Sequence, residues 1–234
     1  MIQFADCYRG SRVLITGHTG FKGSWLALWL EKRGAEVSGI SLDPETEPNH
    51  RDQLNLSVDD NRLDIRNFDL VSAAVREFRP QIVFHLAAQP SLRRSYRDPI
   101  DNWSTNVMGT AHVLEDCRHV ESVEAIVAIT TDKVYRRSFL NSDDSPYATR
   151  PWQHVLGCLV GYMQLGQRLL EGRREFADAW NFGSQPEANR TVKEVLTALQ
   201  THWPDLKWEQ TATAEQLMTY VADAHPAGVP WVSE

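Results

Sequence analysis

The amino-acid sequence predicts an α/β fold, a doubly wound parallel sheet with helices on both of its faces. Short runs rich in β-branched residues alternate along the first 135 residues with longer segments that repeat apolar residues at helical spacing. A glycine-rich turn joins the first run to the first helical segment. This alternation is typical of parallel sheets, in which each helix carries the chain back to the start of the next strand.

The first half of the pattern begins with the run Arg12–Thr16 (RVLIT), which predicts a buried strand. The segment 22–33 is rich in helix formers, and Gly34 follows it, where a helix C-terminus favours glycine. A second strand is expected at 36–41 and a short third one at 61–65. The next helix ends before Pro80 and carries Phe68, Val71, Val75 and Phe78 at helical spacing.

The second half of the pattern predicts strands at 81–87 and 123–130, with a helix between them. That helix is marked at helical spacing by Trp103, Val107, Thr110 and Leu114. After Tyr135 the sequence turns polar. The elements expected beyond it are a helix over 155–169, a strand at 179–182 and a helix that opens with the capping-box pattern at 191–194.

Composition excludes several classes of partner. The formal net charge is −7 and no basic run occurs, so we expect neither nucleic acid nor an anionic membrane to bind. No apolar run is long enough to span a bilayer, and none precedes the first strand as a secretion signal would. The three separated cysteines fit reduced thiols, which predicts a cytoplasmic protein. No His, Cys and Asp residues have metal-ligand spacing, so no metal is expected.

The glycine-rich turn, Gly17-His18-Thr19-Gly20-Phe21-Lys22-Gly23, has the context of a dinucleotide-binding motif, because it follows a strand and opens a helix. Gly17 would permit the tight turn, Gly20 the approach of a pyrophosphate, and Gly23 the close packing of helix on strand. Free amides and the positive end of the helix dipole would then hold the phosphates. The plainer alternative is a glycine turn without a ligand.

An acidic residue that binds the adenosine ribose should follow about 20 residues later. Asp43 lies there, and Ser41 stands at the end of the second strand, so either could make this contact. Asp43 is equally well explained as the start of a turn before Pro44. No Arg or Lys stands beside it in the sequence to receive a 2′-phosphate, which favours NAD over NADP.

Longer motifs carry a resemblance to a known family. They are TGHTGFKGSW from Thr16, HLAAQP from His85, TNVMGT from Thr105, TTDKVY from Thr130, RPWQHVL from Arg150 and WNFG from Trp180. With them the chain resembles the extended short-chain dehydrogenase/reductases, and among these the CDP-glucose 4,6-dehydratases, over residues 10–135 and about 146–200. The resemblance implies a Rossmann-type sheet over 1–135 that binds NAD, and a remnant of a smaller substrate domain over 136–234. It also implies a lyase that dehydrates CDP-glucose, a nucleotide sugar, in the synthesis of O-antigen deoxysugars.

The resemblance assigns roles only to matching positions. It implies that the pyrophosphate is held around Gly17, Gly20, Phe21, Lys22 and Gly23. It implies that Asp64 and Ile65 flank the adenine, that Ala87, Ala88 and Gln89 line the cofactor, and that Asn106 supports the site. It further implies that Thr131, Asp132 and Lys133 face the sugar and that Arg150 meets the substrate diphosphate.

Similar enzymes pass a hydride from C4 of the sugar to NAD, eliminate water across C5 and C6, and return the hydride to C6. Asp132 would suit the acid of the elimination, and Lys133 the base if its pKa is lowered. The alternative for this pair is a surface ion pair that follows a strand.

A defect accompanies the resemblance. Enzymes of this superfamily remove the C4 hydroxyl proton with a Tyr that is followed four residues later by a Lys, and no Tyr in this chain is so followed. Between TTDKVY and RPWQHVL, the mainly polar stretch of ten residues at 136–145 stands in place of a segment on the order of a hundred residues, more than one supersecondary unit. We therefore expect the strand at 123–130 to be an open sheet edge.

Three hypotheses follow: an enzyme with a substitute base, a non-catalytic NAD-binding remnant or partner of an intact homologue, and a chain that does not fold alone. The second is favoured, because a C4 proton without an acceptor blocks the first step. The resemblance also implies a homodimer through the helix at 105–118.

Overall fold

A computed structural model describes residues 6–131, 147, 149–183 and 188–208. The chain divides into two compact units. The first contains the residues up to Thr130 together with Val155–Phe182, and the second contains Thr131–His154 and the residues from Gly183 onward. The sequence had suggested a single boundary near residue 135, whereas in the structure a later helical segment joins the first unit.

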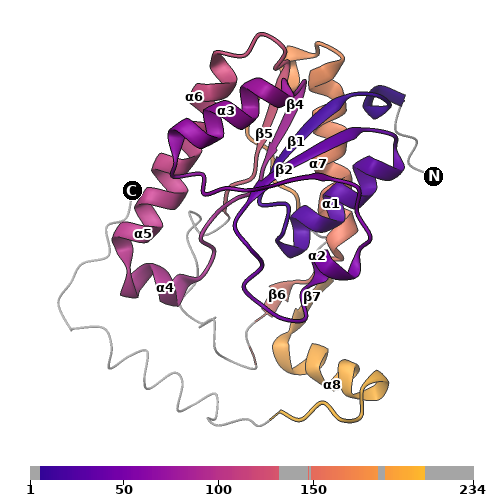
Figure 1. Ribbon diagram of the computed structural model, residues 1–234. Helices are drawn as coiled ribbons and strands as arrows, with labels where there is room; N and C mark the ends of the chain where they lie inside the picture. Colours follow the sequence, from indigo (N-terminus) through magenta and orange to yellow (C-terminus); the bar gives the residue numbers. More distant parts are fainter. Residues whose placement is uncertain (1–5, 132–146, 148, 184–187, 209–234) are drawn as a thin grey trace, which may run out of the picture. The chain divides into compact units, whose positions relative to one another are not determined.

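The first unit is built on a parallel sheet with the strand order β3-β2-β1-β4-β5 (Figure 1). Every neighbouring pair in this sheet is parallel. The strands are β1 (Arg12–Thr16), β2 (Glu36–Ser41), β3 (Asp59–Arg62), β4 (Ile82–His85) and β5 (Ala125–Ala128). The predicted fold class is confirmed. The order reverses between β1 and β4, which is where open parallel sheets bind ligands at their carboxyl edge.

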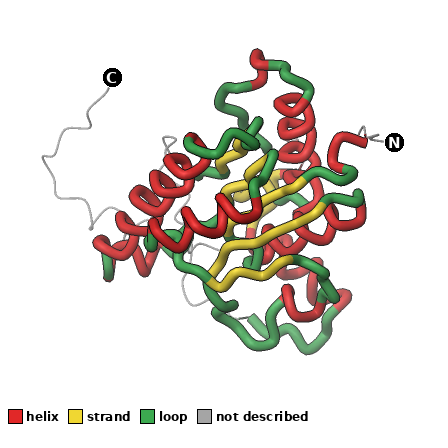
Figure 2. Tube along the Cα trace, turned by 45° about the horizontal axis from the view of Figure 1, so that its top comes forward, coloured by secondary structure: helices red, strands yellow, loops and turns green. Residues whose placement is uncertain are grey.

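Helices cover both faces of the sheet, as Figure 2 shows. Helices α1 (Phe21–Lys32) and α7 (Val155–Leu170) contribute to one hydrophobic core, and α3 (Phe68–Phe78) and α6 (Thr110–Arg118) to the other. Strand β1 serves both cores, because its side chains alternate: Val13 and Ile15 enter the first core and Leu14 the second. All three are fully buried.

Shorter elements surround these helices. The helix predicted around Trp103 is divided into α5 (Pro99–Trp103), a π-helical segment η2 (Ser104–Gly109) and α6. Pro99 starts α5, and the Asp98 side chain accepts from the backbone N–H of Asp101. The sequence did not predict α2 (His50–Gln53), α4 (Leu92–Arg97) or the 3₁₀ turns η1 (Asp6–Tyr8) and η4 (Arg174–Phe176).

Helix α7 belongs to the first unit because its apolar face completes the core. Leu159 and Met163 are fully buried there. The buried Tyr8 hydroxyl donates a hydrogen bond to the backbone oxygen of Met163 over 2.6 Å. A Cβ on Gly166 would lie 2.6 Å from the same hydroxyl oxygen, so helix and tyrosine approach too closely for a larger residue.

The strand predicted at 179–182 is wrong, since the structure has no strand there. The Trp180 indole instead donates to the Phe176 backbone oxygen over 3.0 Å, and Phe182 packs edge-on against Tyr162. A strand requires a neighbour for its backbone groups. Strand β5 is the last strand of the described sheet and pairs with β4.

The second unit contains the antiparallel pair β6 (Thr149–Pro151) and β7 (Asn189–Thr191), followed by α8 (Val192–His202). The capping box at the start of α8 is confirmed. The Glu194 N–H donates to the Thr191 hydroxyl oxygen over 3.1 Å, and the Thr191 N–H donates to the Glu194 carboxylate over 2.7 Å.

Candidate cofactor site

The three glycines of the turn between β1 and α1 have different structural roles. Gly17 has φ +77°, and a Cβ there would lie 2.8 Å from the backbone nitrogen of Ala87. A Cβ on Gly23 would lie 2.1 Å from the Gly17 oxygen. Both glycines are therefore required by the fold itself. Gly20 is extended at φ −69°, and a Cβ there would meet the Gly17 oxygen at an ordinary 3.4 Å.

Gly20 is also the N-cap of α1 and provides no side-chain acceptor. Its own N–H donates to the Gly17 oxygen over 3.1 Å. The N–H groups of a first helical turn have no partner inside the helix, and here no capping side chain takes them. These amides can therefore bind an anion such as a phosphate.

His18 anchors the turn to β2 and β3. Its ring is fully buried, and a Cβ on Gly39 would lie 2.3 Å from it, so the ring packs directly on β2. Its Nε2 lies 2.8 Å from Asp60 Oδ1, which accepts the hydrogen bond, and burial lowers the pKa of the ring. Burial alone would raise the pKa of Asp60, but hydrogen bonds from Arg62 and His18 outweigh it and hold that pKa below its usual value.

A cavity of about 910 Å³ opens in front of the turn. This volume lies within the range of small-molecule and cofactor sites. Its wall includes all but one of the residues expected to bind the cofactor, namely Gly17, Gly20, Phe21, Lys22, Gly23, Asp43, Asp64, Ile65, Ala87, Ala88 and Gln89. The structure thus brings together residues from the carboxyl ends of β1, β2, β3 and β4.

The remaining expected residue, Asn106, does not line the cavity but forms hydrogen bonds with Gln89, which does. Its side-chain oxygen accepts from the Gln89 N–H over 2.7 Å, and its amide nitrogen donates to the Gln89 oxygen over 3.1 Å. The Gln89 amide in turn donates to Asn102 over 3.3 Å. Asn106 lies in the π-helical segment, a distortion that often occurs at functional sites. It therefore fixes the loop after β4, as a supporting residue would.

Asp64 and Ile65 differ in their exposure to the cavity. The Asp64 carboxylate is paired with Arg66, whose hydrogen bonds lower its pKa. Ile65 is buried, and a Cβ on Gly109 would lie 2.6 Å from its Cδ1, so most of its side chain packs against the π-helical segment.

The end of β2 forms another part of the wall. The Thr19 hydroxyl lies 2.6 Å from that of Ser41 and donates to the Leu42 oxygen over 3.0 Å. The Asp43 carboxylate is 86% exposed, and one of its oxygens lies 3.4 Å from Arg62 Nη1. The prediction that no basic residue lies beside Asp43 is therefore wrong. In the structure β3 places Arg62 next to it.

The expected catalytic and substrate residues are only partly described. Thr131 is exposed just beyond β5. Asp132 and Lys133 lie outside the described residues. Arg150 lies in β6 of the second unit, and its side chain also lies outside the described part.

Charged residues that the sequence reasoning missed border the cavity. Asp101 pairs with Arg66 over 2.8 Å and with Arg94 over 3.0 Å. Arg94 also reaches Glu45 over 3.2 Å, which connects α4 with the loop after β2. These residues come from separate segments without a shared motif, so no sequence signal could have grouped them.

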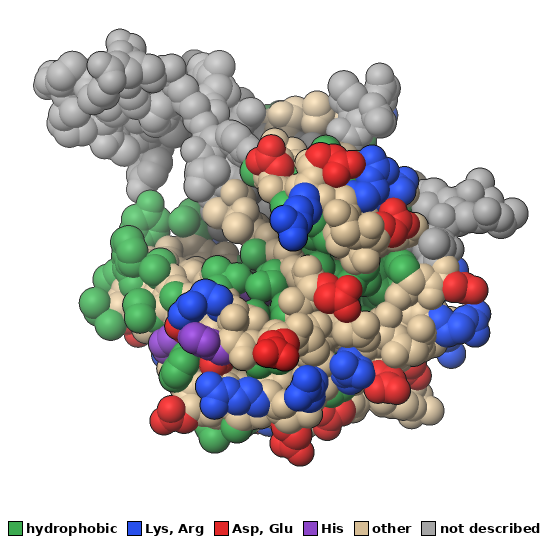
Figure 3. All heavy atoms as spheres, turned by 90° about the horizontal axis from the view of Figure 1, so that it is seen from above, with side chains coloured by type: hydrophobic (Ala, Val, Ile, Leu, Met, Phe, Trp, Pro, Cys, Tyr) green, Lys and Arg blue, Asp and Glu red, His purple; other side chains and the backbone are tan. Residues whose placement is uncertain are grey.

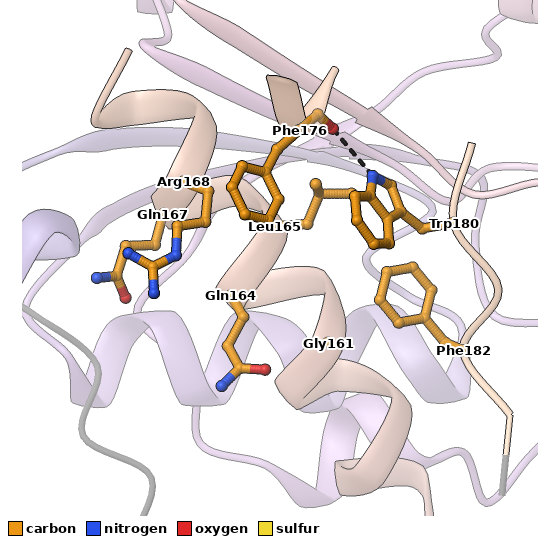
Figure 4. A pocket seen from close by; sticks show the side chains of 8 residues that line it. All are labelled: Gly161, Gln164, Leu165, Gln167, Arg168, Phe176, Trp180 and Phe182. Carbon is orange, nitrogen blue, oxygen red and sulfur yellow. Dashed lines mark hydrogen bonds between the residues drawn. The ribbon is translucent and has the colours of Figure 1, made fainter. Parts of the chain in front are cut away.

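A smaller cavity of about 400 Å³ lies beside α7 (Figure 4). It is lined by the stacked rings of Phe176 and Trp180, by Phe182, and by residues of α7 that include Gln164 and Arg168. It shares no lining residue with the larger cavity.

Within the described residues no group of His, Cys, Asp and Glu is placed to hold a metal ion. The described helices include none with the length and apolar character needed to cross a bilayer.

Comparison with known proteins identifies relatives. Residues 14–139 match the family model of GDP-mannose 4,6 dehydratase. A CDP-glucose 4,6-dehydratase of Salmonella typhimurium is 34% identical over 279 residues, which cover 85% of this chain and 78% of that protein. That alignment is longer than the 234-residue chain, so the relative contains an internal stretch without a counterpart here.

Other relatives are less similar in sequence. A UDP-glucose 4-epimerase of Mycolicibacterium smegmatis is 30% identical, and the match covers 58% of this chain and 44% of that protein. Among solved structures, the Thermus thermophilus UDP-glucose 4-epimerase in complex with NAD matches with a TM-score of 0.62 and 19% identity, covering 89% of this chain and 92% of that one. This likeness supports the fold.

Proposed function

Because this chain belongs to the nucleotide-sugar 4,6-dehydratase family, as a relative of CDP-glucose 4,6-dehydratase, we propose that its first unit binds NAD at the carboxyl edge of the sheet and that the chain does not complete the family's reaction. The proposal of NAD binding rests on Gly20, which begins α1 without a capping side chain and lines the cavity. The proposal that the reaction is not completed rests on the missing Tyr and Lys pair.

The residues of the cavity fit a dinucleotide. The first turn of α1 provides amides for the pyrophosphate, and Gly20 lines the cavity, with only the Gly17 oxygen within 4 Å of the place that a Cβ would take. Asp43, Ser41, Asp64 and Ile65 line the same cavity, where the first two would contact the adenosine ribose and the last two would flank the adenine. Ala87, Ala88 and Gln89, held by Asn106, would border the nicotinamide half. NAD, when bound, supplies a hydride acceptor.

Hydride removal from C4 also requires a base for the C4 hydroxyl proton. A tyrosine serves when a lysine one helical turn away makes its phenol acidic. The sequence offers no such pair. The two buried tyrosines of the first unit do not replace it, because burial raises the pKa of Tyr8 well above its usual value and that of Tyr162 to about 12.

A second candidate is an active dehydratase with a substitute base. The intact TTDKVY motif favours it, since Thr131, Asp132 and Lys133 follow β5 in the order that the resemblance requires. In this case the Asp132→Asn variant would lose turnover and keep NAD binding. Arg150 would then meet the diphosphate of CDP-glucose.

Two measurements on the purified full-length chain separate these candidates. Titration with NAD, followed by tryptophan fluorescence and by thermal unfolding, is expected to show saturable binding and a rise in Tm. Incubation with CDP-glucose and NAD is expected to yield no 4-keto sugar. A keto-sugar product that disappears in Asp132→Asn would replace the first candidate with the second. A broad, low-temperature unfolding transition that NAD leaves unchanged would show that the chain does not fold alone.

We further propose a homodimer through α5 and α6. Ile100 and Trp103 of α5 are 77% and 64% exposed, and Val107 and Met108 of η2 and Leu114 of α6 are exposed as well. Hydrophobic side chains gather at the left edge of Figure 3, on the side where Figure 1 places α5 and α6. An exposed patch of this kind marks an interface. Light scattering should give twice the chain mass, and Trp103→Asp should give the monomer. From the separated cysteines we also propose a cytoplasmic location, and from the resemblance a substrate-region remnant over 136–234.

A further inference from the structure

We propose that His85 is a positioning residue for the cofactor: with its proton on Nε2, its ring connects two sets of hydrogen bonds that keep Ala87 and Gln89 in place along the cavity. His85 itself does not line the cavity, so it acts through these two residues, which do. The inference rests on the proposed binding of NAD and gives a role to a buried side chain outside the glycine turn.

His85 is the last residue of β4, and sheet register brings it beside the end of β1. Thr16 is its parallel partner in the β1–β4 pair. The His85 Nδ1 lies 2.6 Å from the Thr16 hydroxyl oxygen, and the same oxygen accepts from the Ala87 N–H over 3.2 Å. Both side chains are buried, so these polar groups must find their partners within the protein.

The other ring nitrogen of His85 faces α6. Its Nε2 lies 2.9 Å from the hydroxyl oxygen of Thr110, the first residue of that helix. The Thr110 hydroxyl donates to the backbone oxygen of Asn106 over 2.8 Å. The Asn106 side chain in turn holds the backbone N–H and oxygen of Gln89. The ring therefore lies between the hydrogen bonds that fix Ala87 and those that fix Gln89.

One placement of the protons satisfies every group of this chain of hydrogen bonds. The Asn106 backbone oxygen can only accept, so the Thr110 hydroxyl donates to it and accepts from the His85 Nε2–H. Nδ1 then carries no proton and accepts from the Thr16 hydroxyl, for which the described residues offer no other acceptor. The opposite tautomer, or a charged ring, would leave the buried Thr16 proton without a partner. Burial also lowers the pKa of His85 to about 4, which keeps the ring neutral near pH 7.

The Thr110 hydroxyl is the point at which this arrangement can be broken away from the cavity, because Thr110 does not line it. Without that hydroxyl, the His85 Nε2–H loses its acceptor, and the ring is no longer held to one tautomer. A ring that exchanges its proton between the two nitrogens does not fix the Thr16 hydroxyl, so the Ala87 N–H loses a fixed acceptor. The loop after β4 should then order less well around a bound nucleotide.

The test compares Thr110→Val, which keeps the shape of the side chain but removes its hydroxyl, with Thr110→Ser, which retains the hydroxyl. NAD binding to the full-length chain is measured by calorimetry. The His85 tautomer is measured near pH 7 by two-bond ¹H–¹⁵N NMR, with the signal assigned by its absence in His85→Gln. The native ring is expected to carry its proton on Nε2. Thr110→Val is expected to mix the tautomers and to weaken NAD binding about threefold to tenfold, as loss of one hydrogen bond would, and Thr110→Ser to restore both.

Thr197→Val is the matched control, because the Thr197 hydroxyl also donates to a backbone oxygen four residues earlier, in α8, and has no further partner among the described residues. It should leave the NAD affinity and the His85 signal unchanged. Native affinity in Thr110→Val, or weaker binding with an unchanged tautomer, would overturn the inference while the NAD site stands. Mixed tautomers in the native chain would overturn it even if a variant failed to fold. If the native chain did not bind NAD, the proposed function would fail first.

Discussion

The contrast between Gly20 and Gly23 allows the site to be tested separately from the fold. Both residues are changed to alanine, so that each variant gains the same methyl group. At Gly20 the new Cβ meets the Gly17 oxygen at 3.4 Å, in a backbone conformation that alanine adopts freely. At Gly23 it would lie 2.1 Å from that oxygen and 2.8 Å from the His18 Cα, both of them backbone atoms.

The expected magnitudes differ accordingly. Gly20→Ala should change the free energy of unfolding by less than about 1 kcal/mol without ligand. Gly23→Ala should lower it by about 1–3 kcal/mol, as overpacking does, because α1 must move away from the turn. For a chain of this size each kcal/mol shifts Tm by about 2–4 °C, so Gly23→Ala should unfold about 2–12 °C earlier.

The rise in Tm on addition of NAD tests the position of Gly20 next to the phosphates. NAD at a hundred times its Kd stabilises the native chain by about 2.7 kcal/mol, which is a Tm rise of about 5–10 °C. The methyl group of Gly20→Ala enters the space of the phosphates. A tenfold weaker Kd would then leave about 1.4 kcal/mol at the same NAD concentration, which halves the rise.

Differential scanning fluorimetry with and without NAD measures both effects. The reasoning would be refuted if Gly20→Ala unfolded as early as Gly23→Ala without ligand. It would also be refuted if Gly20→Ala kept the full NAD-induced rise, because Gly20 would then not face the phosphates.

Three further predictions concern the groups that surround the site. Burial lowers the pKa of His85 to about 4, so the unfolded chain takes up a proton between its ordinary pKa of about 6.5 and pH 4 while the folded chain does not. The folded state should lose on the order of 3 kcal/mol over this window as pH falls, and urea unfolding from pH 7 to pH 4 should show a smaller loss for His85→Gln. Tyr8→Phe removes the donor to the Met163 oxygen and should destabilise the first unit by about 1–3 kcal/mol in urea, whereas an unchanged midpoint would contradict the attachment of α7. Asn106→Ala frees the Gln89 backbone and should weaken NAD binding several-fold by calorimetry, and native affinity would show that the loop after β4 needs no support.

Much of the first unit follows from local sequence. The run at Arg12–Thr16 and the apolar spacing from Phe68 to Phe78 define elements because strands and helices impose their own periods. The glycine turn is recognisable because strand, spacing and helix coincide. The strand expected at 179–182 failed because strands form in pairs, and the residues alone do not show whether a partner is present.

Contacts between distant segments could not be predicted in the same way. Arg62 meets Asp43 through the register of β2 with β3, and a shift of one residue would turn Arg62 to the other face of the sheet. Similarly, Asp101 forms ion pairs with Arg66 and Arg94 because of the placement of α4 and α5, and these two helices carry no motif of their own. The expected residues of the cavity were found because the family motifs identified them.

The central claim is that the amides of the first turn of α1 bind the phosphates of a dinucleotide. Amide hydrogen exchange of residues 17–24, measured with and without NAD, tests it most directly. We expect exchange to slow at Phe21, Lys22 and Gly23 on addition of NAD, and the same amides to stay fast with nicotinamide riboside, which has no phosphate. Equal exchange at these amides with NAD at millimolar concentration would contradict the claim.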